Sequence, residues 1–120
     1  MANRDRRGAE RRGRRAEIYA AIWLRFKGYK VLEKRFRCRA GEVDLIAKRG
    51  RVLAFVEVKQ RPTEERALSA VPQRNWLRIA MAAEVWAARY PMHRSLDWRY
   101  DLVAIAPRSF PKHYRDFWRP

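Results

Sequence analysis

The sequence of 120 residues has a single cysteine, Cys38, and two histidines. A lone cysteine can neither form a disulfide within the chain nor build a zinc site of several thiolates, and free cysteine is most often a partly buried apolar residue. His93 and His113 have no ligand-like spacing, so we expect both to be ordinary surface residues. The lone cysteine favours a reducing compartment, the cytoplasm. There is also no apolar run of about 18 residues, and the Arg-rich start is unlike a secretory signal, so we expect no membrane association.

Acidic residues are scarce as well. The chain has 13 Asp and Glu against 29 Lys and Arg, which gives a net charge of +16. Residues 1–15 supply +5 of this charge, from seven Arg against Asp5 and Glu10, which leaves +11 for residues 16–120. A surplus of this size is typical of proteins with a polyanionic partner, and nucleic acid is the leading candidate. A structural RNA-associated protein remains open on charge alone.

Glycine and proline are few, at five and six, and no stretch is rich enough in them to act as a linker. We therefore expect one domain over residues 16–120, preceded by a basic, flexible or frayed helical segment at residues 1–15. Within that segment, Arg14 and Arg15 are candidate contacts to nucleic acid. The segment could equally serve as a solubilising tail.

Apolar periodicity predicts an α/β domain with mixed strand pairing. Residues 16–27 have helical spacing and precede a glycine, and a second helix is expected from Pro72 to about Tyr90. Strands are expected at residues 29–38, 42–48, 51–59 and 98–106, with a hairpin turn at Arg49-Gly50 and no assignment for residues 108–120.

Three carboxylates and a lysine, Glu42, Asp44, Glu57 and Lys59, interrupt the hairpin segments GEVDLIA and FVEVK. Side chains alternate between the faces of a strand, so Glu57 and Lys59 share one face of the second strand. A turn at Arg49-Gly50 would pair Lys48 with Arg51 and place Asp44 opposite Phe55, with Glu57 diagonal to it on the same face. A shift of the strand pairing by two residues would keep these side chains on one face, whereas a shift by one residue would move them to opposite faces.

Two carboxylates on one face repel unless a cation lies between them or one takes up a proton. All-oxygen ligands suit Mg²⁺ or Mn²⁺, and Lys59 could orient a water or offset charge developing on a phosphate. The alternative for Glu57 and Lys59 is an exposed ion pair on a solvated face. The second strand is apolar on both faces, however, which indicates a central strand whose charges are not simply solvated.

The segments GEVDLIA and FVEVKQR resemble the signature of the YraN-like family of small bacterial proteins. This family is placed in the restriction-endonuclease-like PD-(D/E)xK superfamily, similar to archaeal Holliday-junction resolvases. The resemblance covers about residues 11–106. It implies a single restriction-endonuclease-like domain with an αβββαβ core and a mixed sheet flanked by helices, which agrees with the element order above.

The resemblance also implies roles for particular residues. Asp44 matches the first metal-binding acid of the motif, and Glu57 and Lys59 match its E-x-K pair. Glu17 matches the acid of the first helix and would be a third metal-site carboxylate, although Ala16 stands where the family usually has Gly. Arg61 and Glu42 also match family positions, and we expect them to contact the substrate or form a supporting ion pair. Asn75 stands where the family commonly has a basic residue, but Arg74 and Arg78 lie beside it and are candidate contacts to nucleic acid. Asp101 matches a family Asp, and we expect it to be a structural acid.

We therefore expect a nucleic-acid-binding protein acting as a Mg²⁺- or Mn²⁺-dependent endonuclease. The catalytic residues would be Asp44, Glu57, Lys59 and Glu17, and the metal ligands Asp44, Glu57 and Glu17. DNA is the favoured substrate, and superfamily analogy suggests branched or single-strand-containing forms. The alternative is a non-catalytic DNA- or RNA-binding accessory protein with the same fold. Resolvase-like cleavage would need two active sites, so a homodimer is compatible with this function.

Overall fold

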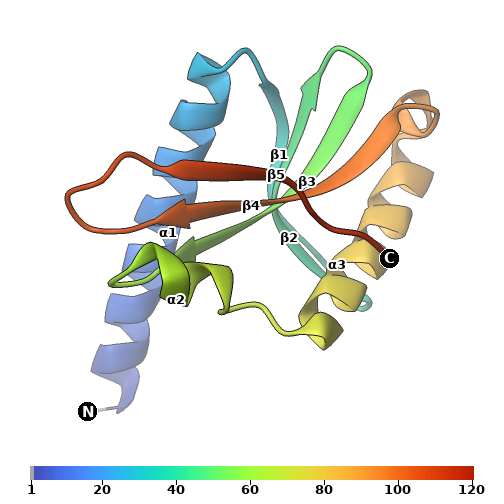
Figure 1. Cartoon of the computed structure of the whole chain (residues 1–120). Helices are drawn as coiled ribbons and strands as arrows, with labels where there is room; N and C mark the ends of the chain where they lie inside the picture. The colour runs from blue at the N-terminus through green and yellow to red at the C-terminus, as the bar shows by residue number, and fades with distance from the viewer. Residues whose placement is uncertain (1) are drawn as a thin grey trace.

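The computed structural model describes the backbone of residues 2–120 and the side chains of residues 13–120. Its centre is a five-stranded sheet in the order β1-β2-β3-β4-β5, in which only β3 and β4 run parallel. Helices α1 and α3 lie on opposite faces of this sheet (Figure 1). The elements are α1 (Ala2–Phe26), β1 (Lys30–Cys38), β2 (Gly41–Arg49), β3 (Val52–Gln60), α2 (Glu64–Leu68), α3 (Gln73–Arg89), the 3-10 helix η1 (Pro91–His93), β4 (Asp97–Ile105) and β5 (Lys112–Trp118).

Strand β3 is the middle strand and is buried on both faces, as its sequence predicted. Ala54 and Val56 pack with the buried face of α1, whereas Leu53 and Phe55 pack with the aromatic face of α3. Two apolar layers therefore hold the sheet between the helices. This arrangement confirms the predicted αβββαβ core of a single α/β domain.

The hairpin turn differs from the prediction by one position. Gly50 and Arg51 form the turn, so Arg49 pairs with Val52, and Ile46 rather than Asp44 pairs with Phe55. Gly50 has a φ of +59° while Arg51 keeps a negative φ, which fits a type II′ turn with glycine in the first central position. The register moves by two residues, so the predicted face is preserved.

Helix α1 begins at Ala2, well before the expected start at Ala16. The backbone of residues 2–15 is therefore helical and continuous with the rest of α1. Whether this basic segment behaves as a flexible unit separate from residues 16–120 stays a prediction. The side chains of residues 1–12 lie outside the described part of the chain.

Two short elements had no clear sequence signal. Helix α2 has only five residues, capped by the Thr63 side chain, which accepts a hydrogen bond from the Arg66 backbone N–H. Strand β5 comes from the unassigned tail and forms one edge of the sheet. Cys38 is half-buried at the end of β1, as expected. Of the helices that the structure describes, none has the length and apolar character needed to span a membrane.

Candidate metal and nucleic-acid site

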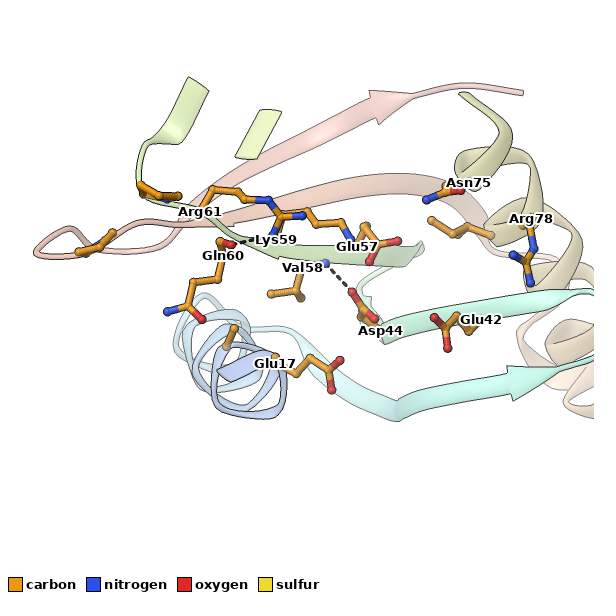
Figure 2. Close-up of a pocket in the computed structure, with 15 residues that line it drawn as sticks. Glu17, Glu42, Asp44, Glu57, Val58, Lys59, Gln60, Arg61, Asn75 and Arg78 are labelled. Carbon is orange, nitrogen blue, oxygen red and sulfur yellow. Dashed lines mark hydrogen bonds between the residues drawn. The ribbon is translucent and has the colours of Figure 1, made fainter. Parts of the chain in front are cut away.

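The candidate site lies where β2 and β3 separate. Their backbone pairing ends at Leu45 and Val56. Immediately beyond, the backbone N–H of Val58 donates a 2.8 Å hydrogen bond to Oδ2 of Asp44, so a side-chain carboxylate replaces the missing backbone carbonyl (Figure 2). Because this bond uses one oxygen of Asp44, the carboxylate is held in a fixed position at the point of separation.

The strands separate because they follow different neighbours. The start of β2 lies against α3, where the Arg78 carbonyl comes so close that a Cβ on Gly41 would be 2.5 Å from its oxygen. In contrast, β3 pairs with β4 along its whole length through Gln60 and Ile105. The two strands therefore open a cleft between α1 and α3 while remaining joined in the rest of the sheet.

A cavity of about 650 Å³ occupies this cleft. Its walls come from α1 on one side and the first turns of α3 on the other, with the ends of β2 and β3 at its base (Figure 2). The charged and amide side chains that line it are Glu17, Glu42, Asp44, Glu57, Lys59, Gln60, Arg61, Asn75 and Arg78. Residues from four separate elements thus face one space.

All four predicted catalytic residues line this cavity: Asp44, Glu57, Lys59 and Glu17. Of the basic residues predicted to contact nucleic acid, Arg61 and Arg78 also line it. Arg14, Arg15 and Arg74 are exposed but are not among the lining residues. The cleft therefore brings together the motif residues and part of the predicted basic set.

Glu57 lies half-buried beside Asp44. Burial, followed by hydrogen bonding to Asp44 and the negative charge of Asp44, raises the pKa of Glu57 well above its ordinary range. The positive charge of Lys59 lowers this pKa but does not offset the rise. Without a cation, the cleft therefore favours a protonated Glu57 next to Asp44.

Glu17 enters the cleft from α1, with its side chain only 13% exposed. Burial, and then the charge of Asp44, raises the pKa of Glu17 to about 7, although nearby Arg35 and Arg37 lower it. Nε of Arg35 lies 3.1 Å from Oε2 of Glu17. Arg35 could not be predicted from the sequence, because its pairing with Glu17 depends on how α1 packs against β1.

Arg35 also has an unusual backbone. Its φ is +52°, in a region that non-glycine residues seldom adopt. The residue falls between the β1–β2 pairs Lys34–Leu45 and Phe36–Val43, where the regular pairing skips one position. This local irregularity lies directly across from Asp44.

The donor chemistry of the cleft fits a hard divalent cation. Asp44, Glu57 and Glu17 offer carboxylate oxygens, the ligands that Mg²⁺ and Mn²⁺ prefer. Burial first, and then the neighbouring Asp44, raises the pKa of both Glu57 and Glu17, and a bound cation would favour the ionised form of each. Within the described residues, no three His, Cys, Asp or Glu side chains form a ready-made metal-binding group. The carboxylates fit by type and by electrostatics, without a preformed coordination shell.

The remaining predicted residues are structural or peripheral. Glu42 makes an exposed ion pair with Arg37 at 3.2 Å, at the edge of the cleft. Gln60 and Asn75 line the cavity, but sequence reasoning assigned neither a role. Their amides are too common in loops and helix starts for sequence alone to single them out.

Asp101 lies outside the cleft and is fully buried in β4. It accepts hydrogen bonds from Arg99, from Nε2 of His113 at 2.7 Å and from the Asp116 backbone N–H. Burial alone would raise the pKa of Asp101, but the hydrogen bonds from these three partners and the charge of Arg99 outweigh it and lower the pKa. Asp101 is thus a structural acid, as expected, although it lies within the strand rather than at its end.

The expectation that His113 is a surface residue is wrong, because its side chain is only 1% exposed. Nδ1 of His113 lies 2.7 Å from Nζ of Lys27, so the imidazole links the end of α1 to Asp101. This bridge joins residues 86 positions apart, a distance over which single-residue patterns carry no information.

Comparison with known proteins gives a consistent family match. The model of the family described as "Uncharacterised protein family UPF0102" matches residues 16–105. A UPF0102 protein of Maricaulis maris is 47% identical over 117 residues, covering 98% of this chain and 92% of its own length. Similar proteins from Chelativorans sp. and Bartonella tribocorum are 46% and 49% identical; they cover 98% and 88% of this chain, and 94% and 82% of their own lengths.

Proposed function

The chain belongs to the uncharacterised protein family UPF0102, and we propose that its cleft hydrolyses phosphodiester bonds in DNA with the help of a divalent cation. The observation that carries this proposal is the meeting of Asp44, Glu57 and Lys59 where β2 and β3 separate. Burial and the neighbouring Asp44 raise the pKa of Glu57 there, and a cation would favour its ionised form. A structural ion pair alone would not require a second acid beside Glu57.

Asp44 and Glu57, with Glu17, would hold a Mg²⁺ or Mn²⁺ ion. When bound, such an ion would polarise a phosphoryl oxygen and lower the pKa of a bound water. The hydrogen bond from Val58 fixes Asp44, while the ion pair with Arg35 orients Glu17 toward the cleft. These contacts restrain Asp44 and Glu17 individually, which would lower the cost of ordering them around a cation.

Lys59 lies on β3 two residues after Glu57, and therefore on the same face of the strand. Its ammonium group can orient the attacking water or offset the negative charge that develops on the phosphate. Arg61, directly after β3, and Arg78 in α3 line the same cavity, so they can hold phosphates on either side of the reacting one. DNA is the proposed substrate, and a branched or single-strand-containing form is part of the proposal.

The test compares the full chain with Asp44→Asn and with Asp97→Asn, a matched change at an exposed acid of β4. Each protein is incubated with labelled linear duplex, single-stranded and four-way-junction DNA, in Mg²⁺, in Mn²⁺ or in a chelator. We expect cleavage only with metal. It should fall about 100-fold or more in Asp44→Asn and remain unchanged in Asp97→Asn.

DNA binding is measured in the same samples with the chelator present. Metal-independent binding with no cleavage of any substrate would contradict the proposal. It would instead support the non-catalytic DNA- or RNA-binding accessory protein.

A further inference from the structure

Helix α1 packs on the sheet with one face only (Figure 1). Ala20 and Leu24 are fully buried on that face. On the opposite face Ile18 and Ile22 are exposed, and Phe26 is 88% exposed. These three residues are four positions apart, so they form one continuous line along the helix, about 12 Å long, which we call the α1 ridge. A contiguous apolar surface of this kind marks a place where another molecule binds.

The α1 ridge is the centre of a larger apolar patch. Beside it, Trp23 is half-buried and stacks on Phe110 of the β4–β5 loop, with the two ring centroids 5.7 Å apart. Phe110 itself is 73% exposed. Ten large apolar side chains are exposed in the described part of the chain, and half of them lie in this patch: Ile18, Tyr19, Ile22, Phe26 and Phe110. The exposed apolar surface is therefore concentrated on and around α1.

Arginines border the α1 ridge along one side of the helix. Arg14 and Arg25 are exposed and eleven residues apart, which is about three turns, so they lie on the same side of α1. Arg15, also exposed, lies at the N-terminal end of the ridge. Among the described side chains of α1 the one acid is Glu17, which lines the cleft about 140° round the helix from Ile22. The surface thus combines an apolar ridge with a row of positive charge.

This combination disfavours three kinds of partner. A nucleic acid would neutralise the arginines but leave Ile18 and Ile22 uncovered, because bases stack on aromatic rings and not on aliphatic side chains. A second copy of the chain would cover the ridge, but it would bring three arginines from each copy together, and like charges across an interface are unfavourable. A bilayer would present headgroups on both sides of the ridge, whereas the arginines of α1 border it on one.

We propose that the α1 ridge binds an amphipathic helix of another protein, whose apolar stripe is bordered on one side by Asp or Glu. The apolar side chains of such a helix would pack against Ile18, Ile22 and Phe26, as ridges pack into grooves between helices. Two acids about three turns apart on one side of the partner helix would pair with Arg14 and Arg25. The ridge and the cleft lie on different sides of α1, so the inference goes beyond the proposed function and does not depend on it.

The test measures binding of the full chain to a labelled helical peptide of Leu, Glu and Ala by fluorescence anisotropy. The peptide has about 18 residues, enough to span the ridge and both arginines, with Leu on one face and Glu along one side of that face. A second peptide has the same composition in an order that spreads Leu around the helix. The comparison therefore separates recognition of an apolar face from attraction between charges.

Two double variants of the protein test the ridge itself. Ile18→Gln with Ile22→Gln removes two ridge positions. Leu77→Gln with Met81→Gln is the matched control, because these two residues are also exposed, apolar and four positions apart on a helix, α3. Glutamine is a good helix former, and circular dichroism checks that the fold is kept.

The ridge variant should bind the amphipathic peptide at least about tenfold more weakly than wild type, and the α3 control should bind as wild type does. Arg14→Gln with Arg25→Gln should also weaken binding and reduce its salt dependence. Arg39→Gln with Arg66→Gln, which removes the same charge at two exposed positions elsewhere, should have neither effect. No binding of the amphipathic peptide, equal binding of the reordered peptide, or equal affinity of the ridge and control variants would overturn the inference.

Two further measurements identify a different occupant. A dimer of the wild-type chain that dissociates in the ridge variant, seen by sedimentation, would overturn the inference in favour of a second copy. Binding to phosphatidylserine vesicles that is lost in the ridge variant would overturn it in favour of a lipid surface. Metal-dependent cleavage of DNA by the ridge variant should equal that of wild type, so a failure of the proposed function leaves the peptide measurement unaffected.

Discussion

Glu57 and Asp44 occupy a place where two negative charges side by side are unfavourable. The half-buried position of Glu57 and its contact with Asp44 favour a proton on Glu57 in the metal-free protein. A pair of this kind lowers stability, because folding must hold an acid in a form that it would not adopt in water. The cleft thus accepts a cost in stability that a bound cation would offset.

This cost gives a pH prediction for Glu57→Gln. The folded state holds a proton on Glu57 above pH 4.5, the ordinary pKa, whereas the unfolded state releases it. The folded state then binds more protons, so this group lowers the free energy of unfolding as the pH rises from about 5 toward its raised pKa. Glu57→Gln should therefore melt at a higher temperature than wild type at pH 8 in a chelator, with little difference near pH 4.

Thermal unfolding between pH 4 and 9 measures this difference. Glu84→Gln, a change at an exposed acid of α3, serves as the control and should follow wild type. A Glu57→Gln protein that is less stable than wild type at pH 8 would show that the ionised carboxylate is stabilising. The electrostatic description of the cleft would then be wrong.

The sequence predicted which residues lie together where their side chains share one face of a strand. Asp44, Glu57 and Lys59 were placed together because a period of two fixes the face on which each lies. Arg35 and His113 were not found, because their partners Glu17 and Asp101 are brought to them by the packing of distant elements. Patterns among neighbouring residues in the sequence do not predict contacts of this kind.

At the scale of elements, the site depends on the divergence of β2 from β3. Asp44 takes over a backbone hydrogen bond at the point of divergence, and α3 meets the start of β2 through a close contact at Gly41. This contact sets the position of Arg78, and with it one wall of the cleft. The distance between β2 and α3 therefore controls the width of the site.

Gly41→Ala should push β2 and α3 apart and lower the stability of the fold. Its Cβ would lie 2.5 Å from the Arg78 carbonyl oxygen, a backbone atom that cannot move without shifting α3. We expect a loss of about 1–3 kcal/mol in the free energy of unfolding, as for other overpacked sites. The shifted α3 should also weaken metal-dependent cleavage.

Gly13→Ala is the matched control, because no atom lies within 4 Å of a Cβ at that position in α1. Alanine in place of a helical glycine should raise stability by up to about 1 kcal/mol. Urea unfolding of both variants measures these changes. Equal stability of the two variants would show that the contact between β2 and α3 is not tight.

The elements themselves were largely predictable, but their edges were not. Apolar patterns predicted α3 and strands β1 to β4 to within a few residues of their bounds. The hairpin turn was misplaced because Arg49-Gly50 and Gly50-Arg51 both offer a glycine, and only the backbone shows which central position it takes. Helix α2 and strand β5 are short, and their residues are held mainly by neighbouring elements.

At the scale of the whole molecule, a small group of acids lies in one cleft of a strongly basic chain. The cleft gathers Glu17, Asp44 and Glu57 in a chain whose net charge is +16. A basic body around an acidic centre attracts a polyanion overall while leaving a local place for a cation. This combination is what the proposed chemistry requires of a protein of this size.

The central claim is that this centre cleaves DNA, and single-turnover cleavage by wild type and Lys59→Gln tests it most directly. Protein in excess is mixed with labelled DNA and Mg²⁺, and binding is measured separately in a chelator. We predict that both proteins bind DNA within about tenfold of each other, whereas Lys59→Gln cleaves at least about 100-fold more slowly. Equal cleavage rates, or no cleavage by wild type on duplex, single-stranded or junction DNA, would contradict the claim.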